Sequence, residues 1–321
     1  MKRALSLLLP LLTILPALPL AAQDYPNRTV RLIVPFPAGG STDILARTVA
    51  QKLNESYGQL FIAENRAGAT GTIAGAFVAK SPPDGYTLIM HSASTYTAGY
   101  LYRKLSYDAA SAFAPVINLV VNPFIIVSAA SLPVKSITEL IALARRRPNE
   151  LTYATVGTGS GAHLATEMFN FAAGIKTIAV AYKGSTPAMI ALASGETGFA
   201  TNNILDTQSF VRQGKMRALA TTGAKRSPAV PDAPTLIESG IPVEANLWTG
   251  VFATGGTPKT IVNKLNDDIA RFFDTPQMKD WLLANLGGEY TPNTPEQFAA
   301  FLAGDSARWK KIVEQTGLRL D

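Results

Sequence analysis

Short apolar runs alternate with longer segments of helical periodicity along most of the chain. In its first part, the pattern predicts strands at 29–36, 59–64 and 86–90 and helices at 42–57 and 72–80. An alternation of strand, helix and strand favours a parallel sheet, because parallel neighbours need a long crossover that a helix supplies. We therefore predict an α/β fold with helices on both faces of the sheet.

A second cycle of the same kind follows, and its apolar runs again alternate with helical periodicity. The predicted elements are a helix at 137–146, a strand at 151–155, a helix at 162–172, a strand at 177–181, a helix at 186–193 and a strand at 216–221. The tail is predicted to be helical. Thr257 is predicted to be the N-cap of a helix whose first residue is Pro258. Thr294-Pro-Glu-Gln297 predicts a capping box.

The sequence pattern at the N-terminus indicates that the protein is exported. Lys2 and Arg3 precede an apolar stretch at 5–20, and Ala21 and Ala22 follow it. This is typical of a signal peptide at 1–22 that is cleaved near Ala22. A membrane anchor is disfavoured, because the stretch contains three prolines and is shorter than the ~20 residues that a bilayer needs. The apolar segment 113–132 also contains prolines, and it predicts two buried strands rather than a membrane helix.

Composition limits the function. The chain of 321 residues suggests two domains, and its lack of cysteine excludes disulfides. Lys2 and Arg3 account for two of the six net positive charges, so the mature chain carries about +4. The densest basic run, 145–147, ends a predicted helix, where cations favour the helix dipole. We therefore expect no nucleic-acid partner.

Two glycine-rich turns echo each other in the two halves of the chain. The segments "VRLIVPFPAGGSTDILARTVA" and "LTYATVGTGSGAHLATEMF" both have the order strand, turn and helix. Ligands of open α/β sheets bind at the carboxyl ends of strands, and a helix N-terminus favours an anion. Two such turns that face across a cleft would hold an anionic ligand from both sides.

Neither turn matches an enzyme motif. The first lacks the lysine of a phosphate loop, and the second is G-x-G-x-G rather than the dinucleotide pattern. Ser160 lies between adjacent glycines, which is not the spacing of a nucleophile elbow. With two histidines and no cysteine, nothing marks a metal site. We predict no catalytic residues, no metal and no cofactor, with a secreted enzyme of unrecognised chemistry as an alternative.

Several ordered blocks resemble a known family across residues 25–321. They include "YPNRTVRLIVPFPAGGSTDILAR", "ENRAGATGTIAGAFVAKSPPDGYTLIM", "LTYATVGTGSGAHLATEMF" and "AYKGSTPAMIALASGE". They resemble the periplasmic solute receptors of tripartite tricarboxylate transporters, the Bug (Bordetella uptake gene) family. The resemblance implies a two-lobed, type II-like periplasmic-binding-protein fold, each lobe a mainly parallel sheet flanked by helices. It implies lobe 1 at 23–123 and 249–321 and lobe 2 at 124–248.

The resemblance also implies ligand contacts, which fall into three groups. The first turn would supply Phe36, Ala38, Gly39, Gly40, Ser41, Thr42 and Asp43. The second would supply Gly157, Thr158, Gly159, Ser160 and His163. The distal part of the ligand would meet Ser92, Ser94, Thr95, Asn202 and Asn203. We expect Asp43 to orient its turn rather than contact the ligand, since an acid there can accept backbone N–H bonds.

The implied function is a periplasmic receptor that closes on a small carboxylate and delivers it to membrane permease subunits. A sensor that docks on a signalling partner remains an alternative, and a monomer is implied. Ala38 and Ser41 depart from the proline and glycine common in the family. Asn202 stands where an aspartate is common, and we interpret this as favouring a plain carboxylate over an amino acid.

Overall fold

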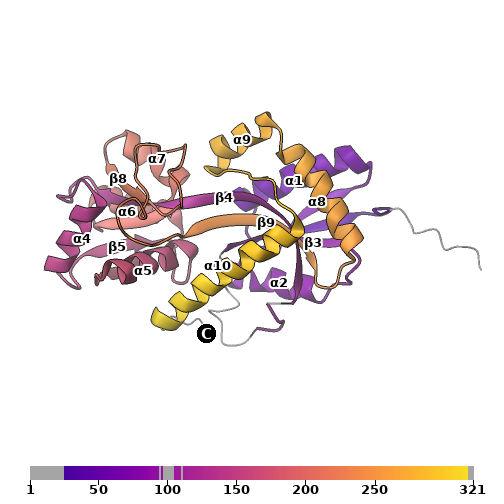
Figure 1. Cartoon of the computed structure of the whole chain (residues 1–321), viewed down its shortest axis with the longest axis horizontal. Helices are drawn as coiled ribbons and strands as arrows, with labels where there is room; N and C mark the ends of the chain where they lie inside the picture. Colours follow the sequence, from indigo (N-terminus) through magenta and orange to yellow (C-terminus); the bar gives the residue numbers. More distant parts are fainter. Residues whose placement is uncertain (1–24, 94, 97–104, 110, 317–321) are drawn as a thin grey trace, which may run out of the picture.

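The strands of the protein form one mixed sheet that runs the length of the molecule (Figure 1). The computed structural model describes residues 25–93, 95–96, 105–109 and 111–316. Within them the sheet has nine strands in the order β2-β1-β3-β9-β4-β7-β5-β6, with β8 paired to β4. The predicted α/β class is confirmed. The sheet is parallel at both ends and antiparallel in the middle, where β9 pairs with β3 and β4.

The observed elements follow the predicted order and differ by a few residues at their ends. The strands are β1 Val30–Val34, β2 Phe61–Asn65, β3 Thr87–Ser92, β4 Phe113–Ala129, β5 Thr152–Thr155, β6 Ile178–Ala181, β7 Phe199–Asn203, β8 Met216–Thr221 and β9 Asn246–Thr254. The helices are α1 Ser41–Tyr57, α2 Thr72–Ala79, α4 Ile137–Arg146, α5 Gly161–Ala173, α6 Ser185–Ser194, α7 Ile204–Arg212, α8 Lys259–Phe273, α9 Pro276–Leu286 and α10 Pro295–Thr316, with a 3₁₀ turn at Ala69–Gly71.

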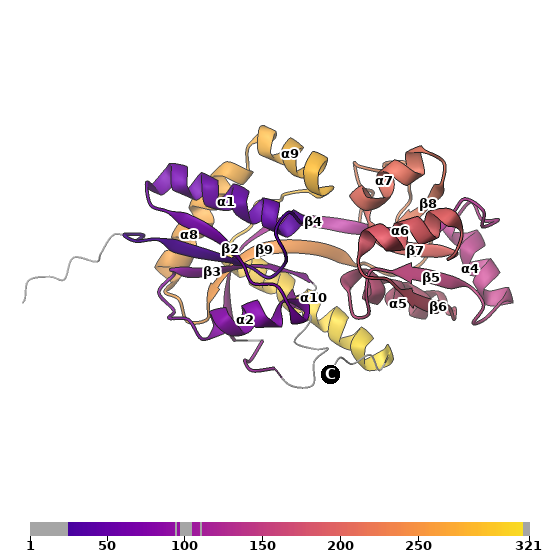
Figure 2. The ribbon, with the colours of Figure 1, turned by 180° about the vertical axis from the view of Figure 1, so that it is seen from behind.

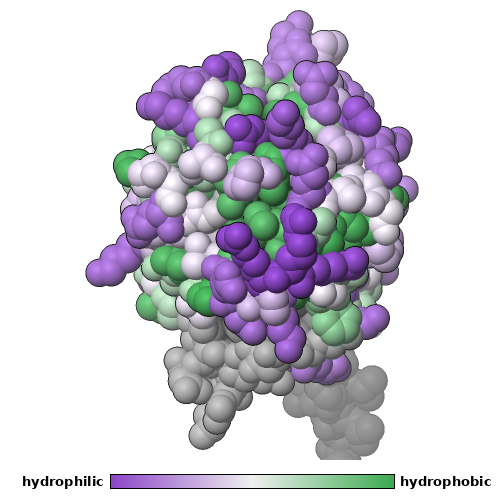
Figure 3. Space-filling view, turned by 90° about the vertical axis from the view of Figure 1, so that its left-hand side faces the viewer, coloured by the Kyte–Doolittle hydropathy of each residue, from purple (hydrophilic) through white to green (hydrophobic). Residues whose placement is uncertain are grey.

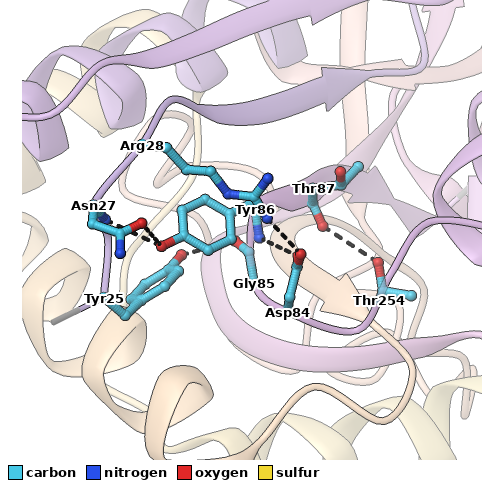
Figure 4. Close-up of polar contacts among 8 residues, drawn as sticks. All are labelled: Tyr25, Asn27, Arg28, Asp84, Gly85, Tyr86, Thr87 and Thr254. Carbon is cyan, nitrogen blue, oxygen red and sulfur yellow. Dashed lines mark hydrogen bonds and ion pairs between the residues drawn. The ribbon is translucent and has the colours of Figure 1, made fainter. Parts of the chain in front are cut away.

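In the half of the molecule that contains β1, β2 and β3, the first half, alternate residues of the strands face opposite helix layers. Leu32 packs in a cluster with α1, α8 and α9, whereas its neighbour Ile33 packs with α2 and α10. This is the two-residue period of a strand that is buried on both faces. Figure 4 shows how the start of the described chain is attached to this half. The Tyr25 hydroxyl donates to the Gly85 carbonyl, and Arg28 forms an ion pair with Asp84.

The other half, which contains β5, β6, β7 and β8 and is called the second half, is built in the same way. Helices α4 and α5 cover one face of β5 and β7, and α6 and α7 cover the other. Strand β6 forms the edge of the sheet. Figure 3 shows this end of the molecule, where an apolar area is surrounded by hydrophilic side chains.

Helix α10 connects the two halves. Phe298 and Leu302 pack in the first half, and Trp309 and Val313 pack in the core of the second. Its start has the predicted capping box: Thr294 N–H donates to Gln297 Oε1 over 2.9 Å, and Gln297 N–H donates to Thr294 Oγ1 over 3.2 Å.

The prediction of two strands within 113–132 is wrong, because β4 is one continuous strand of 17 residues. Pro115 lies at a shift in the register with β9, and Pro123 is the last residue that pairs with β9. From Phe124 onward, β4 pairs with β7 and β8 instead. The prolines are tolerated because each lies where the ladder is already interrupted.

The predicted start of the helix after residue 257 is also wrong by one position. Pro258 is the N-cap of α8, and the helix begins at Lys259. Thr257 instead donates its hydroxyl to the Thr254 carbonyl over 2.7 Å, which closes the turn after β9. No helix in the described part of the chain is long and apolar enough to cross a membrane.

Candidate ligand-binding site

Strands β4 and β9 pair side by side and run from one half of the molecule to the other, and we call them the crossing strands. A cavity of about 500 Å³ lies on one face of this pair. Figure 2 shows α1 and α9 from the first half and α6 and α7 from the second around these strands. The lining residues are Gly39, Gly40, Ser41, Ile44, Leu45, Val120, Asn122, Thr186, Asn203, Leu205, Asp206, Leu247, Thr249, Asn285 and Leu286. The volume suits a small organic molecule.

The strands explain why these residues face the cavity. Val120 pairs with Thr249 and Asn122 pairs with Leu247, so all four lie on the same face of the ladder. The intervening Val121 and Pro123 face the other way and line a separate cavity of about 360 Å³. The crossing pair therefore has a hollow on each face.

Three helices direct their N-termini to the first cavity, from both halves of the molecule. They are α1 after Gly40, α6 after Gly184 and α7 after Asn203, and no side chain caps any of the three. Each leaves N–H groups of its first turn without a partner inside the helix. Such groups, together with the helix dipole, favour a carboxylate or another anion.

The first glycine-rich turn is held by Asp43. Its Oδ2 accepts bonds of 2.9 Å from the backbone N–H of Gly39 and from Arg47 Nε, and its Oδ1 accepts from Asn65 Nδ2 over 2.8 Å. Burial alone would raise the pKa of this carboxyl, but these three bonds outweigh burial and lower it to about 2. Asp43 thus binds its own turn.

The second turn has the same construction with a histidine in place of the acid. His163 Nδ1 accepts the backbone N–H of Gly159 over 3.0 Å, and Ser160 Oγ caps α5 by accepting the N–H of His163. Gly39 and Gly159 both have positive φ, 87° and 77°. Burial lowers the pKa of His163, and Glu167 opposes that effect. The accepting nitrogen carries no proton, so the ring is neutral.

The structure brings some of the predicted site residues together and leaves others apart. Gly39, Gly40, Ser41 and Asn203 line the cavity. The remaining residues of the first turn lie beside it, with the Phe36 carbonyl bonded to Asn65, Ala38 exposed and Thr42 buried in α1. Asn202 lies next to the cavity and donates to Ser185.

Other predicted residues lie outside the cavity lining. The turn that contains Gly157, Thr158, Gly159, Ser160 and His163 follows β5, at the same sheet edge as Asn203, because β5 and β7 are parallel. Ser92 and Thr95 are buried, and Thr95 Oγ1 bonds to His91 Nδ1. Ser94 lies outside the described residues.

Sequence reasoning missed Asn122, Asp206 and the end of α9. Asn122 lies in the middle of β4, and its Nδ2 donates to the Leu286 carbonyl over 2.9 Å. Asp206 lies in the first turn of α7, where its Oδ2 accepts from Ser185 Oγ over 2.7 Å. The one available signal was the position of Asp206 just after Asn202 and Asn203, within a helix start.

The family model described as "Tripartite tricarboxylate transporter family receptor" matches residues 45–318. Protein BugT of Bordetella pertussis is 36% identical over 307 residues, which cover 95% of this chain and 94% of BugT.

Solved structures show the same fold. R. palustris Rpa4515 with adipate is 39% identical, covers 92% of this chain and 99% of its own, and superposes with a TM-score of 0.80. MatC from Rhodopseudomonas palustris with bound malate is 32% identical, covers 90% of this chain and 100% of its own, and superposes with a TM-score of 0.75.

Proposed function

The chain belongs to the tripartite tricarboxylate transporter receptor family, and from that membership we propose that it captures a small carboxylate in the cavity between its halves. The family consists of solute-binding proteins, so the chain is a binding protein and not an enzyme. Its fold is the α/β periplasmic-binding-protein fold.

The observation that carries the proposal is the meeting of three uncapped helix N-termini at one cavity. Two of them, α6 and α7, belong to the second half, and α1 belongs to the first. Movement of the halves about β4 and β9 would bring these groups to one carboxylate from both sides. Relatives solved with adipate and with malate support this ligand class.

We further propose that residues 1–22 direct export to the periplasm, that the lobes are divided at 23–123, 124–248 and 249–321, and that the closed receptor docks on permease subunits of a tripartite transporter. The basic and apolar pattern of the N-terminus supports export. Adjacent genes for a large and a small membrane subunit would support delivery to a permease, whereas a neighbouring sensor kinase would favour signalling.

A thermal-shift screen tests the carboxylate. Mono-, di- and tricarboxylates, amino acids, aromatic acids and neutral sugars are added to the purified protein. A ligand at about 100 times its dissociation constant stabilises by ~2.7 kcal/mol, which is a clear rise in melting temperature. If a neutral sugar raises the melting temperature and no carboxylate does, the proposal is wrong.

A further inference from the structure

Two side chains of the cavity lining, Asn122 and Asp206, carry oxygen acceptors, and one of these oxygens has no donor among the described residues. Asn122 is 5% exposed, and its Oδ1 has no hydrogen-bond partner there. Its orientation is fixed, because only the amide nitrogen can donate to the Leu286 carbonyl. A buried acceptor without a donor costs free energy, so this amide oxygen is a cost that the protein carries at the base of the cavity.

Asp206 is a second acceptor, and it is the one ionisable side chain among the described lining residues. Asn202 Nδ2 donates to Ser185 Oγ over 2.7 Å, and Ser185 Oγ donates to Asp206 Oδ2 over 2.7 Å. This chain of bonds holds the carboxylate at the start of α7. An ionised carboxylate has about four acceptor positions, so one bond leaves most of its capacity free.

The two acids near the site differ in their partners. Asp43 is paired with Arg47 and turned into its own loop. The ion pairs found among the described residues do not include Asp206. The charge of Asp206 therefore acts on whatever enters the cavity, and it repels a negative group while attracting a donor.

We propose that the cavity selects carboxylates that also carry a hydrogen-bond donor, an ammonium or hydroxyl group, and that Asp206 is the specificity residue that receives this donor. The proposal rests on the proposed function: the N-termini of α1 and α6 hold the carboxylate end, and Asp206 at the start of α7 receives the donor. It differs from the preference for a plain carboxylate that Asn202 suggests, and the wild-type ranking described below decides between the two.

Matched ligands that differ in one substituent test the proposal. Titration calorimetry on the wild-type protein compares succinate, malate and aspartate, and then glutarate, 2-hydroxyglutarate and glutamate. We expect a donor-bearing member of a trio to bind roughly tenfold or more tightly than the plain diacid. Asp206→Asn should remove that preference. Asp267→Asn, an exposed acid of α8 outside the cavity, should keep it.

The outcomes separate the two proposals. If the plain diacids bind most tightly, or if Asp206→Asn leaves the ratio within each trio unchanged, the role of Asp206 is wrong while the carboxylate receptor stands. If no carboxylate of any kind binds, the proposed function fails and the role of Asp206 falls with it. The wild-type ranking requires no substitution, so it holds even if a variant is unstable.

Discussion

His163 accepts the backbone N–H of Gly159 at Nδ1 over 3.0 Å, and it thereby holds the turn that precedes its own helix. Asp43 does the same for Gly39 over 2.9 Å. In both turns the acceptor lies four residues after the glycine, in the first turn of the helix. The two halves therefore fix their turns by the same bond, but one acceptor is a permanent anion at neutral pH and the other is a base.

The second turn should lose stability in mild acid. Burial lowers the pKa of His163, and Glu167 opposes this effect; Tyr153 is stacked on the ring. As the pH falls, the histidine is therefore protonated in the unfolded chain before it is protonated in the folded protein. The stability that neutral His163 contributes is fully present above about pH 6.5, the ordinary histidine pKa, and is lost as the pH falls below that value. His91, whose pKa burial lowers to about 3, adds to the same trend. Urea unfolding at pH 7 and pH 5 measures the loss.

Substitutions at His163 isolate its share of this loss. His163→Asn keeps a neutral acceptor of the length that Asp43 has, so its stability should fall less between pH 7 and pH 5. His163→Leu leaves the Gly159 N–H without an acceptor and should cost about 1–3 kcal/mol at pH 7. An equal pH dependence in wild type and His163→Asn would show that His163 is not the titrating group.

The first turn should resist acid to a much lower pH. The pKa of Asp43 is lowered to about 2, so its contribution is present above its ordinary value and is lost only as the pH falls towards 2. Asp43→Asn should cost about 2 kcal/mol at neutral pH, because three bonds to the anion are weakened. Asp274→Asn, which breaks an exposed pair with Lys279, should cost less than about 1 kcal/mol. Equal losses would contradict the role of Asp43.

Adjacent glycines of the first turn should respond differently to alanine. Gly39 has φ of 87°, so Gly39→Ala should cost about 1–2 kcal/mol although a Cβ meets nothing within 4 Å. Gly40 has φ of −79°, and its Cβ would meet only the Pro37 carbonyl at 3.8 Å. Gly40→Ala should therefore keep the melting temperature and weaken carboxylate binding, since the methyl enters the cavity. Unchanged affinity would remove Gly40 from the site.

A second glycine pair tests how α10 packs on the crossing strands. A Cβ on Gly250 would lie 2.6 Å from both the Ile117 carbonyl and the Phe298 ring. Gly250→Ala should cost about 1–3 kcal/mol, because one neighbour is a backbone carbonyl of β4 and the other is a buried aromatic ring. Gly304 lies in the interior of α10 with open space, so Gly304→Ala should stabilise by about 0.5–1 kcal/mol. Chemical denaturation of both variants measures the difference.

Local signals in the sequence were sufficient for most elements. The strand, turn and helix at 29–57 and again at 151–173 depend on short-range periodicity and on glycines that adopt positive φ. The capping box at Thr294 is likewise local, because its two bonds join residues three apart. Such features can be predicted without knowing what packs on them.

Features that depend on distant partners could not be predicted. Pro123 suggested a break in the strand, but β4 continues through it. Pro123 pairs with Asn246 at the end of the ladder with β9, and the next residue, Phe124, pairs with Asn203 at the start of the ladder with β7. Asn122 and Asp206 belong to no motif, and they share a cavity only because β4 and α7 meet in the folded chain. The amide and carboxylate carry no sequence pattern that marks them as cavity residues.

The hollows on opposite faces of β4 and β9 have a mechanical consequence. The ladder between Val120 and Pro123 fixes the two strands to each other, so the halves cannot slide apart along it. Bending and twisting remain, and a bend that shortens one surface of a beam lengthens the other. We therefore expect a bend that narrows the cavity around Asn122 to widen the one around Val121, so that a ligand bound in the first would change the shape of the opposite surface without contacting it.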